Sequence, residues 1–166
     1  MKYTYTIILI FVVQLLSAQC YPDRHNTTWY DAWTSCTPSP NPNTLRGESH
    51  WILYNLGHLY ELKNSKFWNA NHPDFLQDGL KDVVIDVSNN GTDWTEWGTF
   101  TLPMASGSNT YEGDIGPDFT ATTARYVLIT ALNNYGGNCY SMSELKINVL
   151  PAPLAVTWSE IKAEGR

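Results

Sequence analysis

Residues suited to recognising a polar ring compound occur in three stretches that are rich in turn-forming residues. They are Arg46 in the first stretch, Trp68, Asn69 and His72 in the second, and Asn133, Asn134 and Tyr135 in the third. An aromatic side chain can cover the apolar face of a ring, while amide, imidazole and guanidinium groups bond its hydroxyls. The chemistry that these residue types suggest is non-covalent binding. Trp68 fits a hydrophobic core equally well, whereas Tyr135, between asparagine and glycine, is expected to be exposed.

Motifs of covalent catalysis are missing from the sequence. The chain contains no Gly-x-Ser-x-Gly, no His-Glu-x-x-His and no phosphate-binding loop. Ser143 and Lys146 have the Ser-x-x-Lys spacing, but residues three apart on a strand point to opposite faces. Acidic residues outnumber basic ones by 16 to 10, and no basic block occurs. We therefore expect neither an enzyme nor a nucleic-acid-binding protein.

The N-terminus has the layout of a secretory signal peptide. Lys2 precedes a short apolar run over residues 7–16, and small residues follow it. A membrane span needs roughly 20 apolar residues, so we predict a cleaved signal at residues 1–19 and no transmembrane segment. Residues 20–149 suffice for one domain. The proline-rich residues 150–166 are interpreted as a linker and the start of a further module or sorting region.

The part that follows this signal contains three cysteines, Cys20, Cys36 and Cys139. No Cys or His spacing is typical of zinc. An exported chain can form disulfides, and we favour Cys20 with Cys36 because both lie in the same loop-rich segment. Cys36 with Cys139 is the alternative pairing. Acylation of Cys20 is less favoured, because a small residue rather than Gln19 is expected before a lipidated cysteine.

Short strands separated by turn signals fill the domain. Residues 83–88 alternate between two faces, Asn90-Gly91 suits a tight turn, and residues 92–100 return. This pattern predicts an antiparallel hairpin. Further strands are expected over residues 50–56, 59–69, 125–131 and 143–149. The stretches 103–119 and 132–142 are expected to be mainly loops, and no long segment has helical periodicity. The sequence therefore predicts an all-β protein, an antiparallel β-sandwich or barrel.

Four segments resemble, in the same order, motifs of discoidin-type domains, also called coagulation factor 5/8 type C domains. Residues 50–57 (HWILYNLG) are similar to the family's W-I-x-x-D-L-G strand, and residues 84–94 to its I-x-x-S-x-D-G-x-x-W hairpin. Residues 124–129 (ARYVLI) resemble A-R-Y-V-R-I, and residues 143–145 resemble S-E-I. The resemblance covers residues 20–149 and implies a jelly-roll β-sandwich of galactose-binding type.

The resemblance also implies a function. Many bacterial members are carbohydrate-binding modules of secreted glycosidases or adhesins, so we expect a non-catalytic module that binds a glycan or polysaccharide. The ring-binding candidates named at the outset are then the predicted glycan ligands. One alternative is an adhesion or protein-interaction module without a sugar site. A less favoured alternative is an accessory domain within a glycoside hydrolase or another secreted enzyme.

Two further expectations rest on the same resemblance. Members of the family often hold a structural calcium ion, for which Glu144 occupies the position of the closing Glu and Asp31 is a second candidate ligand. Residues 150–157 also resemble the L-P-V-x-L linker that precedes sorting modules of the bacterial type IX system. This likeness implies a secreted or cell-surface protein that is larger than this chain and has several domains.

Overall fold

The computed structural model describes residues 32–152. The predicted signal peptide, Cys20, Asp31 and most of the tail lie outside these described residues. The strands are β1 Trp33–Ser35, β2 Ser39–Pro40, β3 Glu48–Asn69, β4 Asp82–Ser88, β5 Thr95–Thr101, β6 Asp114–Ala131 and β7 Tyr140–Pro151. Two short 3-10 helices accompany them, η1 Thr44–Arg46 and η2 Pro73–Asp78. Between residues 32 and 152, no helix has the length and apolar character that crossing a membrane requires.

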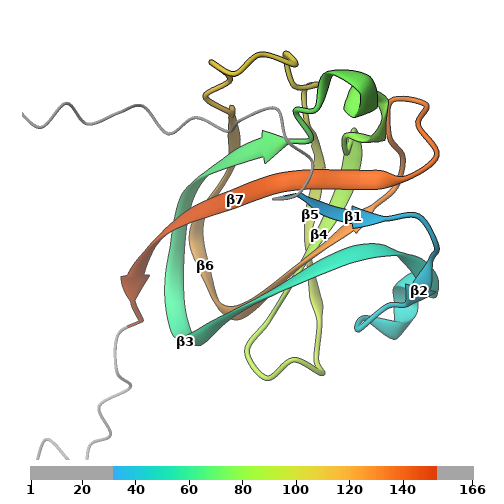
Figure 1. Ribbon diagram of the computed structural model, residues 1–166. Helices are drawn as coiled ribbons and strands as arrows, with labels where there is room; N and C mark the ends of the chain where they lie inside the picture. The colour runs from blue at the N-terminus through green and yellow to red at the C-terminus, as the bar shows by residue number, and fades with distance from the viewer. Residues whose placement is uncertain (1–31, 153–166) are drawn as a thin grey trace, which may run out of the picture.

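The strands form two layers that share their longest members. Their order is β1-β7-β3-β6-β4-β5, with β2 on β3, and each of these pairs is antiparallel. Residues 50–55 of β3 pair with residues 126–131 of β6, beside β4, whereas residues 60–69 of β3 pair with β7 and the first half of β6. Figure 1 shows β3 and β6 curving from one layer into the other. The predicted antiparallel β-sandwich is confirmed.

The bend of β3 lies where the sequence suggested a boundary between two strands. Gly57 has a φ of 83°, which glycine adopts without steric cost, and its N–H donates to Asn55 Oδ1 at 3.0 Å. The register between β3 and β6 shifts between Asn55 and Tyr60. Residues 50–56 and 59–69 are therefore two arms of one strand, and this bend allows β3 to serve both layers.

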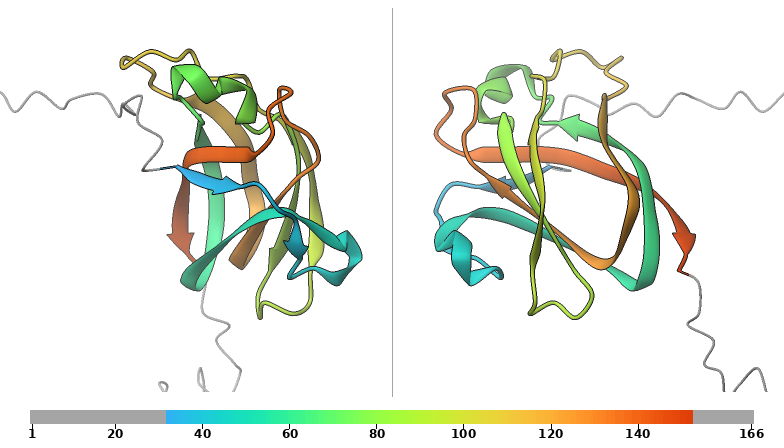
Figure 2. Two further views of the ribbon diagram at one scale, coloured as in Figure 1. Left: turned by 45° about the vertical axis from the view of Figure 1, so that its right-hand side comes forward. Right: turned by 180° about the vertical axis from the view of Figure 1, so that it is seen from behind.

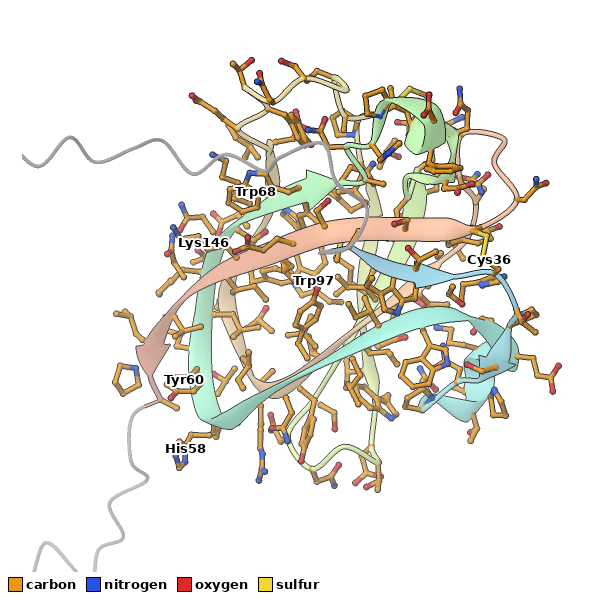
Figure 3. The ribbon with its side chains drawn as sticks, in the orientation of Figure 1. Cys36, His58, Tyr60, Trp68, Trp97 and Lys146 are labelled. Carbon is orange, nitrogen blue, oxygen red and sulfur yellow. A yellow bond between two sulfur atoms is a disulfide. The ribbon has the colours of Figure 1, made fainter. Side chains whose placement is uncertain are left out.

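The core lies between the layers and contains the alternating residues of the central hairpin. Val83, Ile85 and Val87 of β4 are buried, together with side chains from β3, β6 and β7. Trp97 of β5 packs against this cluster (Figure 3), with its ring centroid 4.8 Å from that of Phe119. These three residues face the core, as the alternation predicted. Val84, Asp86 and Ser88 on the opposite face are also buried, so β4 is not the half-buried strand that was expected.

Two predicted boundaries are wrong. Residues 103–119 were expected to form a loop, but β6 begins at Asp114. The Gly116-Pro117 pair hides this strand in the sequence, yet glycine is needed there because a Cβ would lie 2.4 Å from Ser65 Oγ. β7 also continues past residue 149, because Leu150 and Pro151 pair with β3.

The favoured disulfide is wrong as well, since Cys36 bonds to Cys139. β1 runs antiparallel to the start of β7, with Ser35 opposite Tyr140, so the cysteines that follow and precede these residues face each other. Figure 3 shows the bond beside the label of Cys36. Proximity in the sequence favoured Cys20, but strand pairing brings together two residues that are 103 positions apart.

Candidate functional site

Three connections gather at one end of the sandwich: the segment that contains η2, the loop of residues 103–113, and the loop of residues 132–139. Figure 1 shows them together at the top of the molecule, and both views in Figure 2 agree. Backbone N–H groups of Tyr135 and Gly137 each donate to Gln77 O at 3.1 Å. Cys139 N–H donates to Asp78 Oδ1, also at 3.1 Å. The loop before β7 is therefore held against η2.

The sequence His72-Pro73-Asp74 begins η2. His72 is the N-cap and Pro73 follows it, where a missing N–H has no cost. The Asp74 N–H donates to His72 Nδ1 at 3.2 Å. A nitrogen that accepts a hydrogen bond carries no proton, so the neutral His72 ring carries its proton on Nε2. This arrangement provides a hydrogen-bond donor on the imidazole edge that the cap does not use.

A cavity of about 320 Å³ opens beside η2, between it and the ends of β1 and β7. Its described lining consists of Ala32, Thr34, Ala70, Asn71, His72, Phe75, Asp78, Cys139 and Ser141. Phe75 is 50% exposed, and its ring centroid lies 4.9 Å from that of His72 at an interplanar angle of 40°. An exposed aromatic ring, an imidazole and a carboxylate thus surround one concave surface, which suits the binding of a ring with both apolar and hydroxyl-bearing faces.

Trp68 and Asn69 were predicted as glycan ligands, and the structure corrects both. Trp68 has no exposed surface and forms a small second core with Ala105, Tyr111 and Leu76. Asn69 is 1% exposed, and its amide donates to Leu80 O and Pro103 O at 2.7 and 2.8 Å. Trp68 therefore belongs to the core, which was the other interpretation of this residue. Trp68 packs against Ala105 and Tyr111, and Asn69 bonds to Pro103, so both side chains support the loop of residues 103–113.

Asn133, Asn134 and Tyr135 are brought to the same end as η2 but do not line the cavity. Asn134 Nδ2 donates to the carbonyls of Gly137 and Cys139 at 3.0 and 2.7 Å, which shapes the loop. Tyr135 is partly buried rather than exposed, and its hydroxyl donates to a backbone carbonyl, Leu102 O. Their role as glycan ligands stays a prediction.

Asn133 is the more exposed of the two asparagines and bonds to the start of β4. Its Nδ2 donates to Asp82 Oδ2 at 2.7 Å, and its Oδ1 accepts from Asp82 N at 2.9 Å. The hydrogen bonds that Asp82 accepts from Thr101 and from Asn133 hold its pKa below the ordinary value. These contacts attach the loop before β7 to the β4 edge of the site.

Arg46 does not reach this end of the molecule, so its predicted place in the glycan site is corrected. It lies on η1, which both figures place beside β2 and away from η2. Its Nε and Nη2 donate to the two oxygens of Asp86 at 3.0 and 2.7 Å, and Nη2 also contacts Glu96 at 2.8 Å. Asp86 is fully buried. The hydrogen bond to Asp86 raises the pKa of the Arg46 guanidinium. Arg46 therefore neutralises a buried carboxylate.

Of the two expected calcium ligands, Glu144 lies within the described residues and Asp31 lies outside them. Glu144 lies on β7 opposite Trp68. Burial and, secondarily, the charge of Glu144 raise the pKa of the Tyr54 hydroxyl. Within residues 32–152 no group of three or more His, Cys, Asp or Glu side chains could hold a metal ion, and Asp31 lies outside this range. Calcium is also bound by backbone carbonyls and by Asn and Gln side-chain oxygens, so a bound calcium ion stays a prediction.

Phe75, the most exposed ring of the site, was not predicted as a ligand residue. The residue lies in a polar stretch, and its one distinguishing signal was a large apolar side chain within an expected loop. Single exposed apolar residues are common on protein surfaces, so this signal alone did not indicate a ligand site. The cavity itself had no sequence signal, because it forms where β1 packs along β7 next to η2.

Several solved structures resemble this chain. CBM32-3 from a family 31 glycoside hydrolase of Clostridium perfringens is 18% identical, with a TM-score of 0.49 over 72% of this chain and 75% of that chain. The C-terminal domain of a chitobiase from Bacteroides fragilis is 19% identical, with a TM-score of 0.47 over 72% of each chain.

A family 89 glycoside hydrolase from Clostridium perfringens, in complex with GlcNAc-alpha-1,4-galactose, is 13% identical, with a TM-score of 0.50 over 78% of this chain and 14% of that chain. At this identity the likeness concerns the fold alone. No curated protein sequence matches the chain significantly. The F5/8 type C domain family, in contrast, matches residues 22–145. Because this match spans most of the sequence, the chain belongs to the F5/8 type C domain family.

Proposed function

We propose that this chain is a non-catalytic carbohydrate-binding module that attaches a larger secreted or cell-surface protein to a glycan. One observation carries the proposal: the half-exposed ring of Phe75 lies beside His72 at the mouth of a cavity at the loop end of the sandwich. Membership of the F5/8 type C family supports it. The names of structural neighbours, which include a carbohydrate-binding module and glycoside hydrolases, agree with it.

The geometry suits a pyranose. The exposed face of Phe75 can cover the C–H side of the sugar ring, and the Nε2–H of His72 can donate to a ring hydroxyl. Asp78 lines the same cavity and accepts one backbone N–H through Oδ1, so Oδ2 can accept from a sugar hydroxyl. Recognition would thus combine one stacking surface with a donor and an acceptor.

A binding role rather than hydrolysis agrees with the charges of the cavity. Glycoside hydrolases generally use a pair of carboxylates that flank the scissile bond. Among the described residues that line the cavity, Asp78 is the single carboxylate. We therefore assign binding to this chain and leave catalysis to other domains of the proposed larger protein. Export through the predicted signal peptide, type IX sorting and a structural calcium ion at Glu144 belong to the same proposal.

The test is retention of the purified chain on immobilised polysaccharides and on a glycan array, with calcium and with a chelator. We expect retention on at least one glycan, loss of retention in Phe75→Ala, and unchanged retention in Leu45→Ala. Leu45 is a matched control because it is 90% exposed on η1, away from the cavity. A chain that binds no glycan in either condition would overturn the proposal and favour a protein-interaction module.

A further inference from the structure

One buried side chain, that of Asn69, joins two segments that shape the candidate site. Asn69 is 1% exposed and does not line the cavity beside η2. We propose that it is a positioning residue of this site: its amide closes the segment of residues 70–80, which contains η2, and couples this segment to the loop of residues 103–113. Asn69 thereby controls the affinity of the cavity for a glycan, a role that rests on the proposed function.

The first set of contacts closes the η2 segment where it leaves and rejoins the sheet. Asn69 is the last residue of β3, and Leu80 lies shortly before β4. Asn69 Oδ1 accepts from Leu80 N at 2.9 Å, and Asn69 Nδ2 donates to Leu80 O at 2.7 Å. Oδ1 also accepts from Ala70 N at 3.0 Å. The amide thus bonds to both ends of the segment, and its two bonds to Leu80 resemble a backbone pair of an antiparallel sheet.

The segment that these contacts close depends on how its ends are held. η2 is a short 3-10 helix, an element of low intrinsic stability, and Phe75 departs from helical geometry with a φ of −130°. The loop before β7 bonds to the end of η2, at Gln77 and Asp78. Asn69 bonds instead to the residues on which the whole segment begins and ends. The positions of Phe75 and His72 at the cavity therefore depend on Asn69.

The second amide hydrogen of Asn69 reaches the loop of residues 103–113. Asn69 Nδ2 also donates to Pro103 O at 2.8 Å, and the backbone N–H of Asn69 donates to the Tyr111 hydroxyl at 3.3 Å. Asn69 therefore contacts this loop near both of its ends. A displacement of Asn69 would move the loop as well as the η2 segment.

This loop in turn contacts a residue of the cavity wall, Asn71. Gly107 N donates to Asn71 Oδ1 at 2.9 Å, and Asn71 Nδ2 donates to Ser108 O at 2.7 Å. The η2 segment and the loop are thus joined at two points, Asn69 and Asn71. The loop can therefore affect glycan binding although none of its residues belongs to the described lining of the cavity.

The pattern of donors and acceptors around this side chain matches an asparagine. The carbonyls of Leu80 and Pro103 each receive one amide hydrogen, while the N–H groups of Ala70 and Leu80 share the amide oxygen. Aspartate has nearly the same shape but at most one donor. Asn69→Asp therefore removes the hydrogen bond to at least one of the two carbonyls in either protonation state, which leaves a buried acceptor unpaired.

Calorimetric titration of the intact chain, with a soluble glycan that the native chain binds, compares Asn69→Asp with the native chain. Replacement of a residue that orients a ligand-contacting group typically costs about 10–100-fold in affinity, as it does at metal sites. We expect Asn69→Asp to bind the glycan about tenfold more weakly. NMR spectra of the free variant should show amide shift changes across residues 70–80 and 103–111, and not at the immediate neighbours of Asn69 alone.

Asn41→Ala is the matched control, in the segment that leads to η1 and away from η2. Asn41 is also buried, and its Nδ2 donates to Ser49 Oγ and to Thr130 Oγ1, both at 2.9 Å. Loss of these bonds should lower the midpoint temperature of thermal unfolding, as Asn69→Asp does, but should leave the glycan affinity unchanged. The pair of variants therefore separates the position of the η2 segment from overall stability.

Hydrogen exchange in the native chain provides a measurement that does not depend on the folding of a variant. The amides of Ala70 and Leu80 should exchange far more slowly than unprotected amides, because both donate to Asn69 Oδ1. Fast exchange at both amides, unchanged affinity in a folded Asn69→Asp variant, or an equal loss of affinity in Asn41→Ala would each overturn the inference. A native chain that binds no glycan would overturn the proposed function instead, and the shift pattern and exchange rates would still decide whether Asn69 positions the η2 segment.

Discussion

Replacement of Phe75 by alanine tests whether this ring binds the ligand or stabilises the fold. An aromatic side chain offers about 150–250 Å² of surface, and Phe75 is 50% exposed, so roughly 100 Å² is open to a ligand. At about 25 cal/mol per Å², complete coverage of this surface would contribute about 2.5 kcal/mol. A pyranose covers one face of the ring, or about half of this area, which leaves about 1.3 kcal/mol. We therefore expect Phe75→Ala to weaken glycan binding about tenfold.

The assay is isothermal titration calorimetry with a soluble glycan that the native chain binds. Thermal unfolding of the same samples provides the stability control. The exposed half of Phe75 contributes little to the core, so its removal should lower the midpoint temperature by only a few degrees, corresponding to about 1 kcal/mol. Leu45→Ala, an exposed apolar residue on another surface, should change neither quantity.

Two results would contradict a ligand-binding role of Phe75. Unchanged affinity in a folded Phe75→Ala variant would show that the sugar does not stack on this ring. A stability loss as large as that of a core residue, about 3 kcal/mol or more, would show that Phe75 supports the fold instead. Either result would remove the observation on which the proposed function depends.

Three other substitutions test the corrected roles of residues. Trp68→Ala should lower the free energy of unfolding by about 3–5 kcal/mol in urea denaturation, because Trp68 is fully buried; a loss below about 1 kcal/mol would contradict a core role. Cys36→Ser removes the disulfide to Cys139, which is 103 positions away, and should lower the free energy of unfolding by up to about 4.7 kcal/mol. The midpoint temperature of thermal unfolding should fall, and reductant should not lower it further. Arg46→Ala leaves Asp86 buried without its guanidinium partner and should cost about 3 kcal/mol at neutral pH; an unchanged denaturation midpoint would refute the ion pair's role.

The central hairpin shows what the sequence could predict. The alternation of Val83, Ile85 and Val87 with other residues predicts a strand and identifies the side chains on one of its faces. These three side chains do belong to the core. The turn at Asn90-Gly91 is equally local, since Gly91 has a φ of 81°. Because the fold class depends on several such local signals, it was predictable, and the family motifs placed the strands in order.

Features that depend on three-dimensional proximity were not predictable. The bond between Cys36 and Cys139 follows from the pairing of β1 with β7, and sequence distance argued against it. The burial of Trp68 depends on the loop of residues 103–113, which supplies Ala105 and Tyr111. Arg46 has the right chemistry for a ligand site, but its partner Asp86 lies 40 positions away, on β4.

Within the candidate site, only His72 was predicted and also lines the cavity. Its prediction rested on an imidazole in a turn-rich stretch, whereas its position follows from a helix start at His72-Pro73-Asp74 that was not predicted. Phe75 was not predicted because most of its neighbours in the sequence are polar and suggested an ordinary surface loop. The structure shows that its exposed ring lines the cavity beside η2. The site is therefore less predictable than the fold that carries it.

Mapping of the ligand on the protein by NMR shows directly whether a glycan binds in the cavity beside η2. The isotope-labelled chain would be titrated with a soluble glycan that it binds, and changes in amide chemical shift would be located by residue. We expect the largest changes at residues 70–78 and 139–141, around the cavity, with little change at the hairpin tip of residues 88–94. Changes centred on that tip or on η1, or a bound glycan that leaves residues 70–78 unaffected, would contradict binding in this cavity.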